Sequence, residues 1–538
     1  MIGRWTNGLT ARGWSPAVVS GYAALVGLFV WTLSQFYIPG KGFSYLIAFG
    51  GNLETQLLTK VRRLDPYVQK ASDGYDAQYY VQIAMDPSLQ NRELPSAVDS
   101  LPYRARRILF SATAYALGLG RPEWILQAYA LQNPAAWLLL AAVLLHWFPP
   151  RDWDRFLRWA GVLFSFGMCV SVRHALIDGP GLLLVAVGAL LLDRGRPWAA
   201  TAAFALGGLG KETNLLGAAA LAPAGADRRA WAGAVLRGAL VAAPLALWLV
   251  YLAQAVGPVA DAGARNFDWP LFAYFRKWRE VIATLPEMTW PNFGALWSLL
   301  MLVALTTQFV LLVARPRWTE AWWRIGASYA LLLLVLGDAV WEGYPGAASR
   351  VLLPMQVAFN VLAPAGRRWL PVLILGNLTL LSAPVALQAP IGEGYQLRGA
   401  RELQYAPDGN VVEAVFDRAW HQTERDSNSY WRWTEGQAAA DLVNPHRQPL
   451  RFRARFALTT VTARTVSVSL NGQELWSGAV SPVASVQVTL NDLVLAPGRN
   501  RLEFRSPEPP VQVQGDARSI AFCVHGLRFD LQGLAPAP

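Results

Sequence analysis

The sequence predicts an α-helical polytopic membrane protein with about ten to twelve transmembrane helices, joined to a C-terminal all-β sandwich. Three observations predict this architecture. The 538-residue chain is 54% hydrophobic and only 15% charged, whereas about a quarter of the residues in a soluble domain are charged. Apolar runs recur through residues 17–388, and strand-like alternation begins near Arg398. We therefore expect a membrane domain at 1–388 and a sandwich domain outside the membrane at 389–538.

The distribution of charge favours the same division. Residues 389–538 hold 15 arginines and 15 acidic residues, so the net charge of +11 lies entirely in residues 1–388. Most of that charge is arginine at the ends of apolar runs, which is typical of loops that face an anionic cytoplasmic leaflet rather than of a nucleic-acid-binding patch. The two cysteines, Cys169 and Cys523, are too few for a zinc cluster or a disulfide framework.

The first apolar run extends from Ala17 to Tyr37, behind Ser15-Pro16, an N-cap residue followed by a first-turn proline. At about 20 residues this run is long enough to cross a bilayer. It lacks a small-x-small cleavage site, so we expect a retained helix rather than a removed signal. Further apolar runs follow at 123–148, 159–172, 176–192, 197–224, 230–256, 293–314, 325–340, 351–364 and 368–388.

Basic clusters separate these runs, and the positive-inside rule places the clusters on the cytoplasmic side. The clusters are Arg4 and Arg12, Arg151/Arg155/Arg158, Arg194/Arg196, Arg228/Arg229, Arg315/Arg317 and Arg367/Arg368. The segments then expected outside are 38–105, 173–179, 257–292, 341–350 and everything after 388. This alternation requires 107–119 to be an interfacial or re-entrant helix. It also requires 197–224 to be a short hairpin with Gly210-Lys211-Glu212 at its bend.

From about Arg398 the apolar pattern changes from helical to alternating, which is typical of strands. The alternating segments are Arg451–Phe456, Thr465–Leu470, Val486–Leu490, Arg501–Phe504 and Ile520–Val524. Turn sequences, Asn471-Gly472 and Pro497-Gly498, separate some of them. This pattern predicts one antiparallel β-sandwich of about 140 residues, a common size for a single domain.

The expected outer loop at 38–105 holds a group of carboxylates and arginines. It reads Asp73-Gly-Tyr-Asp76-Ala-Gln-Tyr-Tyr80, then Asp86-Pro87, Asp99 and Tyr103-Arg104-Ala-Arg106-Arg107. Residues 74–85 are expected to be helical, with Pro87 ending the helix. A carboxylate here suits deprotonation of an acceptor hydroxyl, and the arginines suit a phosphate leaving group. The alternative is structural: Asp73 and Asp76 have capping-box spacing, and Asp99 is placed to pair with Arg104.

Charged residues inside or beside apolar runs form a second group of candidates, because such residues are expensive at membrane depth. Lys211 and Glu212 are the clearest pair, and a purely structural ion pair is the alternative interpretation. Other candidates are expected at two outer turns of the chain. These are Arg173, His174 and Asp178 at one turn, and Glu342 and Arg350 at the other. The cations would surround the same outer rim as Asp76, as an anionic lipid headgroup requires.

With these motifs in place, residues 17–388 resemble the bacterial polytopic glycosyltransferases of the GT-C superfamily. The resemblance rests on Tyr75-Asp76-Ala-Gln-Tyr-Tyr80, Asp86-Pro87, Asp99, Pro102-Tyr103-Arg104, Arg107, Gly210-Lys211-Glu212-Thr213 and Arg350-Val-Leu-Leu-Pro354. Members often have glycine where this chain has Ala77. The resemblance implies a lipid-phosphate sugar donor and an acidic residue of the first outer loop at the reaction centre. That position falls on Asp76, with Asp73 as the alternative.

The C-terminal segment resembles the carbohydrate-binding jelly rolls that are appended to some of these enzymes. The residues that carry this second resemblance are Trp431-Arg-Trp433 and Pro497–Phe504. Trp431 and Trp433 are therefore candidates for stacking on a sugar ring, although a buried core position is the alternative for tryptophans of a β domain.

Together these features predict an inner-membrane, inverting glycosyltransferase. It would move a hexosyl or pentosyl group from a polyprenyl-phosphate donor to an extracytoplasmic glycan, glycolipid or glycoprotein acceptor. Lys211, Arg173 and Arg350, with Arg104 and Arg107, are expected at the donor phosphate. The rival class is a non-catalytic flippase, or an export or assembly scaffold, for lipid-linked sugars; a transporter would favour paired halves, which this sequence lacks. We expect no cofactor. A divalent cation bound by Asp73, Asp76 and Asp86 is the alternative that the sequence leaves open.

Overall fold

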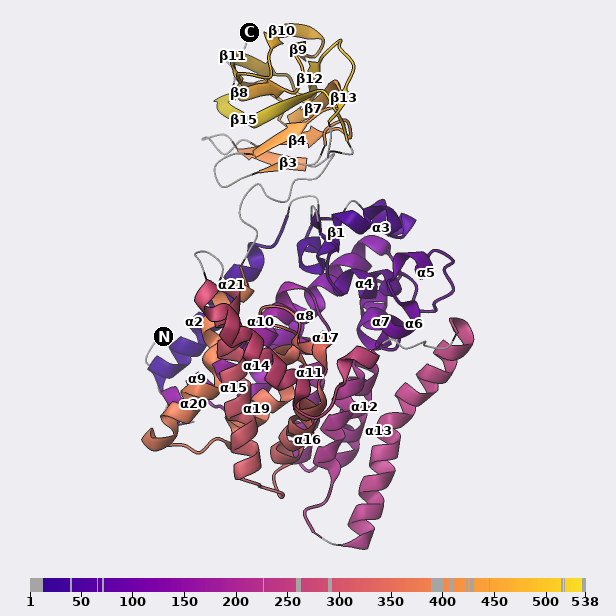
Figure 1. Cartoon of the computed structure of the whole chain (residues 1–538), viewed down its shortest axis with the longest axis vertical. Helices are drawn as coiled ribbons and strands as arrows, with labels where there is room; N and C mark the ends of the chain where they lie inside the picture. Colours follow the sequence, from indigo (N-terminus) through magenta and orange to yellow (C-terminus); the bar gives the residue numbers. More distant parts are fainter. Residues whose placement is uncertain are drawn as a thin grey trace.

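The computed structural model describes residues 13–534, apart from gaps at 39–40, 65, 70–71, 226, 258–262, 289–292, 389–400, 406–410, 422–423, 426–429, 445, 514–515 and 517. The predicted basic pair Arg4 and Arg12 lies outside the described residues. Helices occupy the chain up to Ala386, and strands dominate it from Arg401 onwards. Figure 1 shows a helical body with the sandwich beyond the end at which α3, α4 and α5 lie.

The helical body is built mainly from α-helices of very different lengths. They are α2 (Pro16–Ser34), α3 (Thr59–Arg62), α4 (Ala77–Met85), α5 (Leu94–Ala97), α6 (Leu101–Ala105), α7 (Ile108–Leu117), α8 (Pro122–Leu144), α9 (Trp153–Leu163), α10 (Phe166–Arg173), α11 (Asp178–Asp193), α12 (Pro197–Gly210), α13 (Arg228–Ala255), α14 (Phe272–Thr284), α15 (Gly294–Ala314), α16 (Ala321–Val335), α17 (Asp338–Trp341), α18 (Ala348–Val351), α19 (Leu353–Leu362), α20 (Leu370–Gly376) and α21 (Ala383–Ala386).

Shorter elements complete this body. The 3-10 helices are η1 (Ser44–Ile47), η2 (Gly51–Gln56), η3 (Glu212–Leu221), η4 (Ala264–Asn266), η5 (Leu285–Glu287), η6 (Arg367–Trp369) and η7 (Leu378–Ser382). Two short parallel strands, β1 (Phe49–Gly50) and β2 (Val68–Gln69), pair in the segment that precedes α4.

The first helix begins where the sequence predicts. Ser15 is the N-cap residue of α2 and Pro16 is its first residue, although the Ser15 side chain makes no capping hydrogen bond. On the buried side of α2, the Phe29 ring stacks on Trp137 of α8, with ring centroids 3.7 Å apart. The Tyr22 hydroxyl donates to the Phe148 carbonyl over 2.9 Å. Aromatic packing therefore fixes α2 against α8 and the segment that follows it.

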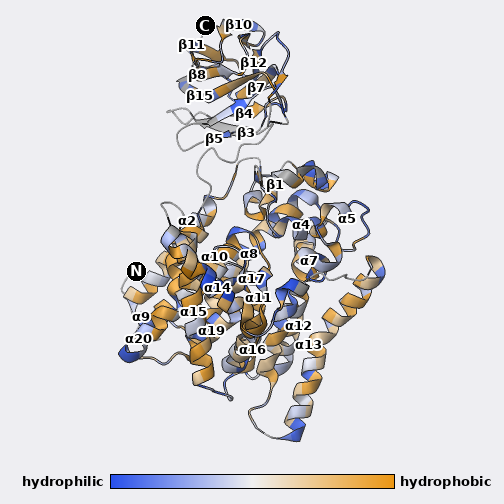
Figure 2. Cartoon of the chain, viewed as in Figure 1, coloured by the Kyte–Doolittle hydropathy of each residue, from blue (hydrophilic) through white to orange (hydrophobic). Residues whose placement is uncertain are grey.

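The described chain has fewer uninterrupted spanning helices than the predicted ten to twelve. Three helices, α2, α13 and α15, are long and apolar enough to cross a membrane. Two bent pairs, α9 with α10 and η6-α20 with η7-α21, bring the number to five if each is one span. Of the remaining apolar runs, 123–148 forms the 23-residue helix α8, which contains Pro134, and the others form shorter helices. In Figure 2 the lower end of α13, where Arg228 begins it, is hydrophilic, and its middle is apolar.

Several of the points at which helices are interrupted coincide with polar residues that are buried between helices. Gln308 Nε2 donates to Gln356 Oε1 over 2.8 Å and to the Gly376 carbonyl over 2.8 Å. Gln356 Nε2 donates in turn to the Gly161 carbonyl and to Asn377 Oδ1, both over 2.9 Å. These hydrogen bonds join α9, α15, α19 and the break after α20. Interhelical polar contacts of this kind satisfy backbone groups that a broken helix leaves free.

The predicted hairpin at 197–224 is present, and its bend lies at Lys211. Helix α12 ends at Gly210, Lys211 is extended, and η3 follows it. The two arms pack closely: a Cβ added at Gly208 would lie 2.5 Å from the Leu215 side chain, and Asn214 Nδ2 donates to the Gly207 carbonyl. The ten-residue helix α7 is too short to cross a bilayer, as expected for 107–119.

The C-terminal segment forms the predicted antiparallel β-sandwich. Its sheets have the strand orders β10-β9-β12-β7-β4-β3 and β11-β8-β15-β6-β5. The strands are β3 (Arg401–Tyr405), β4 (Val411–Phe416), β5 (Glu424–Arg425), β6 (Tyr430–Trp433), β7 (Gln437–Asn444), β8 (Leu450–Thr460), β9 (Arg464–Leu470), β10 (Gln473–Val480), β11 (Val486–Leu495), β12 (Gly498–Arg505), β13 (Val511–Gln512), β14 (Ser519–Ile520) and β15 (Phe522–Leu534).

In this domain the sequence patterns form the turns and strand faces that they predict. Asn471 and Gly472 both have positive φ, at 51° and 84°, so they form the tight turn between β9 and β10 that the Asn-Gly pair predicts. Along β8 every second residue is buried, and Phe452, Phe456 and Leu458 enter the core between the sheets. Trp420 is fully buried in the same core. Both cysteines are buried and free.

Candidate active site

Two neighbouring cavities meet at Asp76. The Lys211 chamber, with a volume of about 330 Å³, is lined by polar residues Asp76, Tyr80, Tyr103, Arg106, Arg107, Asp178, Lys211, Glu212, Thr213, Asn266 and Arg350. The Asp99 chamber, of about 670 Å³, is lined by polar residues Asp73, Tyr75, Asp76, Gln78, Tyr79, Asp99, Arg104, His174, Glu342 and Arg350. Asp76 and Arg350 line both chambers.

Helix α4 positions Asp76. The helix begins at Ala77 with Asp76 as its N-cap residue, and the Asp76 side chain makes no capping hydrogen bond. The helix therefore starts three residues later than a capping box headed by Asp73 would require. It ends after Met85, just before Asp86-Pro87, as predicted. The Asp76 side chain is 37% exposed, so its carboxylate is available to a ligand.

Arg104 holds Asp76 from one side. Its Nη1 atom lies 3.0 Å from Asp76 Oδ1. Its Nε and Nη2 atoms bind the two carboxylate oxygens of Asp99 at 2.9 and 2.7 Å. The predicted alternative, an Asp99–Arg104 pair, is therefore present. Arg104 was expected at the donor phosphate, but it lies in the Asp99 chamber with two carboxylates as partners. Within the described residues Asp76 Oδ2 has no partner.

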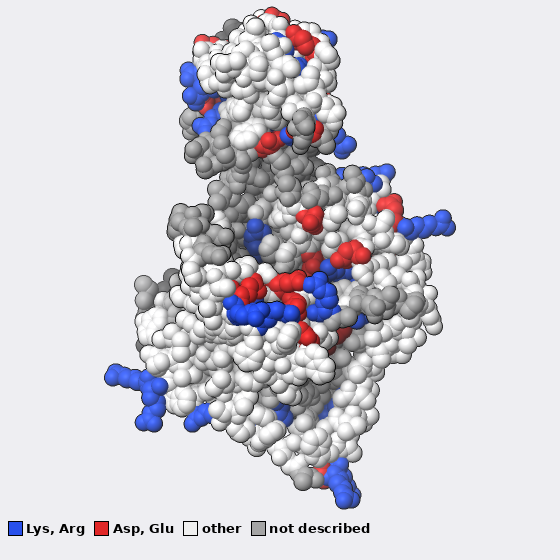
Figure 3. All heavy atoms as spheres, viewed as in Figure 1, with Lys and Arg blue, Asp and Glu red and all other residues white. Residues whose placement is uncertain are grey.

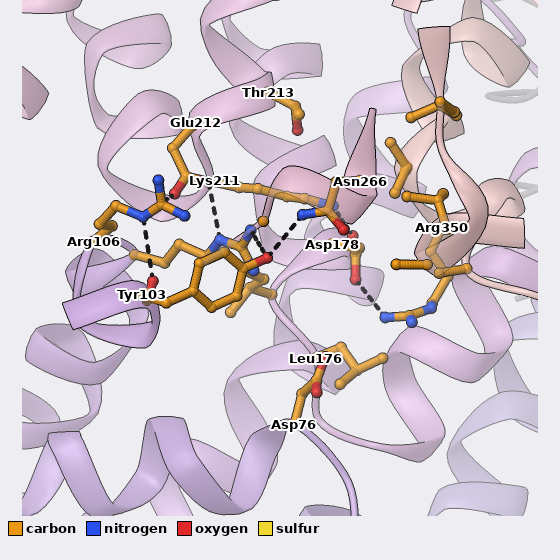
Figure 4. Close-up of a pocket in the computed structure, with 18 of the residues that line it drawn as sticks. Asp76, Tyr103, Arg106, Leu176, Asp178, Lys211, Glu212, Thr213, Asn266 and Arg350 are labelled. Carbon is orange, nitrogen blue, oxygen red and sulfur yellow. Dashed lines mark hydrogen bonds and ion pairs between the residues drawn. The ribbon is translucent and has the colours of Figure 1, made fainter. Parts of the chain in front are cut away.

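Lys211 and Arg350 converge on a buried carboxylate, Asp178 (Figure 4). Lys211 Nζ lies 2.5 Å from Asp178 Oδ1, and Arg350 Nη1 lies 3.2 Å from Asp178 Oδ2. Arg350 Nη2 also donates to the Tyr75 hydroxyl over 3.1 Å. Asp178, at the start of α11, thus ties the hairpin bend to α18. It holds both cations in the wall of the Lys211 chamber.

The Lys211–Glu212 ion pair, which was the structural alternative for these residues, is not formed, although both residues line the Lys211 chamber. Lys211 has extended backbone angles (φ −162°, ψ 130°), so successive side chains leave the bend in different directions. Glu212 instead lies 2.9 Å from Arg107 Nε and 3.3 Å from Arg106 Nε. Arg107 was expected at the donor phosphate, and it does line the Lys211 chamber. There it donates to the Tyr80 hydroxyl over 2.9 Å.

Several lining residues were not among the predicted site residues: Tyr75, Tyr80, Tyr103, Arg106 and Asn266. Tyr103 accepts hydrogen bonds from Arg107 Nη2 and Asn266 Nδ2, both over 3.2 Å. Tyr80 and Tyr103 belong to the same motifs as Asp76 and Arg104, so the sequence did carry a signal for them. Asn266 carried no such signal, because it comes from η4, which is distant in sequence from these motifs.

The two chambers differ in charge. Arg106, Arg107, Lys211 and Arg350 face Asp76, Asp178 and Glu212 in the Lys211 chamber, which leaves one positive charge in surplus. Apolar side chains, among them Leu332, Leu336 and Val351, complete its wall. The chamber therefore suits an anionic group that is attached to an apolar one.

The Asp99 chamber has the opposite balance. Asp73, Asp76, Asp99 and Glu342 face only Arg104 and Arg350. His174 stacks on Tyr75, with ring centroids 4.6 Å apart. Burial, together with the nearby Arg173 and Arg350, lowers the pKa of His174 to about 3, so the ring is neutral near pH 7. Carboxylates and neutral polar rings suit a ligand rich in hydroxyl groups.

Arg173 lines neither of these chambers, although it was expected at the donor phosphate. Its Nη2 donates to the Tyr45 hydroxyl over 2.7 Å, and its Nε donates to the Gln388 carbonyl over 3.1 Å. Its guanidinium also lies over the Tyr45 ring. Arg173 thus joins the outer loop to the end of the helical body. Glu342 does line the Asp99 chamber, where it forms an ion pair with Arg265.

A divalent cation was left open for Asp73, Asp76 and Asp86. Asp86 accepts hydrogen bonds from Ser88 Oγ at 2.5 Å and from the Asn91 amide at 2.7 Å, so its carboxylate serves the turn after α4. Within the part of the chain that the structure describes, no group of three or more His, Cys, Asp or Glu side chains is arranged to hold a metal ion.

Neither a protein-family model nor a curated protein matches this chain. Among solved structures, arabinosyltransferase EmbB from Mycobacterium smegmatis is 11% identical over 95% of this chain and 64% of its own, with a TM-score of 0.29. This chain thus spans less than two thirds of EmbB. The C-terminal CBM6 of LamC from Zobellia galactanivorans is 12% identical over 23% of this chain and 86% of its own, with a TM-score of 0.11. At such TM-scores neither likeness assigns an activity to this chain.

Proposed function

We propose that this protein is a membrane glycosyltransferase of GT-C type. It transfers a sugar from a polyprenyl-phosphate donor to a hydroxyl of an extracytoplasmic glycan, glycolipid or glycoprotein. The single observation that carries this proposal is the position of Asp76. Its carboxylate lies in the wall between a chamber with surplus positive charge and a chamber with surplus negative charge.

In this proposal the Lys211 chamber receives the donor. Lys211 and Arg350 are charge-assisted donors for phosphate oxygens, and Arg106 and Arg107 add positive charge. The apolar wall around Leu332 and Leu336 receives the first part of the lipid chain. Asp178 and Glu212 hold these cations in place before the phosphate arrives, so little reorganisation is needed when it binds.

The Asp99 chamber receives the acceptor. The acceptor hydroxyl oxygen attacks the anomeric carbon while Asp76 takes its proton. The bond between the anomeric carbon and the phosphate oxygen breaks, and the polyprenyl phosphate leaves with the electron pair. Attack opposite to the leaving group inverts the anomeric centre. The phosphate needs no general acid, because the cations of the Lys211 chamber stabilise its charge.

Arg104 is a positioning residue in this reaction. It holds Oδ1 of Asp76 at 3.0 Å and is itself fixed by Asp99. Oδ2 then remains for the acceptor proton. Asp73 lines the Asp99 chamber beside Asp76 but is absent from the Lys211 chamber wall. This supports Asp76 rather than Asp73 as the base.

The proposed location is the bacterial inner membrane, with the sandwich and the loop before α4 on the outer face. The support is the position of one predicted basic cluster. Figure 1 places the start of α13, with Arg228 and Arg229, at the end of the helical body remote from the sandwich. Arginine-rich ends favour the cytoplasmic side.

The test is the Asp76→Asn variant of the full chain, assayed for transfer from a polyprenyl-phosphate sugar. We expect sugar transfer to fall by at least about a hundredfold, as is typical when a general base is lost, while melting behaviour stays close to wild type. Asp73→Asn serves as the matched control and should keep most of the activity. Near-normal transfer by Asp76→Asn would overturn the proposal.

A further inference from the structure

The outer face of the five-stranded sheet carries a groove that the proposed reaction does not use. Its volume is about 610 Å³, and strands β8, β11 and β15 form most of its floor. Figure 3 shows basic side chains on the flank of the sandwich where Figure 1 labels these strands. The polar residues of the groove are Arg455, Thr459, Ser485, Gln487, Thr489, His525 and Arg528.

The alternation of β8 produces a row of arginines on this face. Because Phe452, Ala454 and Phe456 point into the core, Arg451, Arg453 and Arg455 lie on the outer side of the strand. Strand β15 adds Arg528 and a single carboxylate, Asp530. The outer positions of β8 and β15 therefore hold four arginines and one aspartate.

Two of these arginines face each other directly. Arg455 and Arg528 are Cα partners across the antiparallel pair β8–β15, an arrangement in which like charges destabilise a sheet. Asp530 pairs with Arg455 over 2.6 Å. Within the described residues the Arg528 guanidinium makes no ion pair or hydrogen bond, and Arg453 Nε is buried without a partner. A bound anion would relieve this repulsion.

The remainder of the groove suits hydroxyl groups. Thr459 Oγ1 and His525 Nε2 are 2.8 Å apart, and exposed Gln487 and Thr489 extend from β11. The predicted stacking residue Trp431 lies beside the groove rather than in it, with its ring centroid 5.6 Å from that of His525. Its indole N–H donates to Glu424.

We propose that this groove binds an anionic polysaccharide, with a sugar carboxylate between Arg455 and Arg528. The neighbouring amide, hydroxyl and imidazole groups would bind ring hydroxyls, which favours a glycan over an anionic membrane surface. This binding site is separate from the Lys211 and Asp99 chambers. Binding in this groove requires no turnover. The binding proposal can therefore fail while the transferase proposal holds, and the reverse is also possible.

The test measures binding of polygalacturonate to the full chain in detergent micelles, with neutral dextran as the comparison polymer. We expect polygalacturonate to bind, dextran to bind far more weakly, and added salt to weaken the binding. The double variant Arg455→Gln/Arg528→Gln should bind polygalacturonate at least about tenfold more weakly, since two charge-assisted contacts are lost. Arg505→Gln, which removes an exposed arginine from the opposite sheet, is the matched control and should bind like wild type.

Melting curves of each variant report whether the sandwich remains folded, and Arg455→Lys/Arg528→Lys should restore part of the affinity. Three results would overturn the proposal. They are wild-type binding by the double glutamine variant, equal binding of dextran and polygalacturonate, and an equal loss of affinity in Arg505→Gln. Capture by phosphatidylglycerol vesicles without polygalacturonate binding would identify a membrane-binding surface instead.

Discussion

The two chambers share a wall yet are built for opposite charges. In the Lys211 chamber each cation is held by a carboxylate that is distant in sequence: Lys211 and Arg350 by Asp178, and Arg106 and Arg107 by Glu212. In the Asp99 chamber one arginine, Arg104, serves two carboxylates. In Figure 3 charged side chains gather across the middle of the helical body, whereas the surface around them is mostly uncharged.

In the proposed reaction, this difference would let one carboxylate serve two substrates. On one side Asp76 adjoins cations that are ready for an anion, and on the other it adjoins carboxylates that suit hydroxyl groups. A change in one chamber should therefore affect one substrate more than the other. Variants on the two sides of Asp76 test this separation, and the size of their effects should differ.

Lys211→Met should produce the largest change. It removes a charge-assisted donor from the Lys211 chamber, so donor affinity should fall by about ten- to a hundredfold while acceptor KM changes little. The variant should also lower the free energy of unfolding. The reason is that Asp178, rather than Glu212, loses one of its two cationic partners. Removing one partner of a buried pair costs up to about 3–5 kcal/mol, and the remaining Arg350 should reduce that cost.

The matched control for Lys211→Met is Lys277→Met. Lys277 is also buried and paired, since its Nζ lies 3.0 Å from Glu280 and 2.8 Å from the Gly343 carbonyl. It does not line the Lys211 chamber. Its loss should lower the melting temperature without weakening donor affinity. Equal losses of donor affinity in the two variants would make Lys211 a structural residue only.

Arg104→Gln should have an intermediate effect and should act on turnover. Without Arg104, Asp76 loses the contact that fixes Oδ1, so we expect kcat to fall by about tenfold with donor affinity unchanged, because misplaced catalytic groups lose rate rather than binding. Arg104→Lys should recover part of kcat. If Arg104→Gln weakened donor binding as strongly as Lys211→Met, Arg104 would contact the phosphate, as the sequence first indicated.

His174→Gln should have the smallest effect, which we expect mainly on stability against pH. The pKa of His174 is lowered in the folded protein from 6.5 to about 3, so the unfolded chain binds a proton that the folded chain excludes. The stability from this residue is complete above pH 6.5 and is lost as the pH falls towards 3. The melting temperature of wild type should therefore fall more steeply between pH 6.5 and 4.5 than that of His174→Gln. Parallel curves would contradict this assignment.

The sandwich was predictable because its signals are local. Alternation along β8 and the Asn471-Gly472 turn specify strand faces and hairpin register within a few residues. The helical body was harder, because apolar composition alone does not show where a run breaks. Ser165 acts as an N-cap between α9 and α10, and Asn377 joins the buried polar network between α20 and η7. Asn377 is held there by Asn360 and Gln356, which are 17 and 21 residues away in the chain.

The candidate site also has a part that local sequence predicts and a part that depends on contacts between distant residues. The motif containing Asp76, Tyr80, Tyr103 and Arg104 is compact, and the structure brings its members together. Pairings across the fold were not predictable, because Asp178 lies 33 residues from Lys211 and 172 residues from Arg350 in the chain. The expected partner Glu212 was simply the nearest in sequence. Arg173 was misplaced for a related reason, since its partner Tyr45 comes from the loop that follows α2.

The most direct test of the two-chamber account is equilibrium binding of sugar-free polyprenyl phosphate to purified wild type, Asp76→Asn and Lys211→Met. Asp76→Asn removes a negative charge from the wall of the Lys211 chamber, so it should bind the lipid phosphate as tightly as wild type or more tightly, despite its loss of transfer. Lys211→Met should bind it at least about tenfold more weakly. If Asp76→Asn lost binding to the same extent as Lys211→Met, Asp76 would not divide a donor chamber from an acceptor chamber.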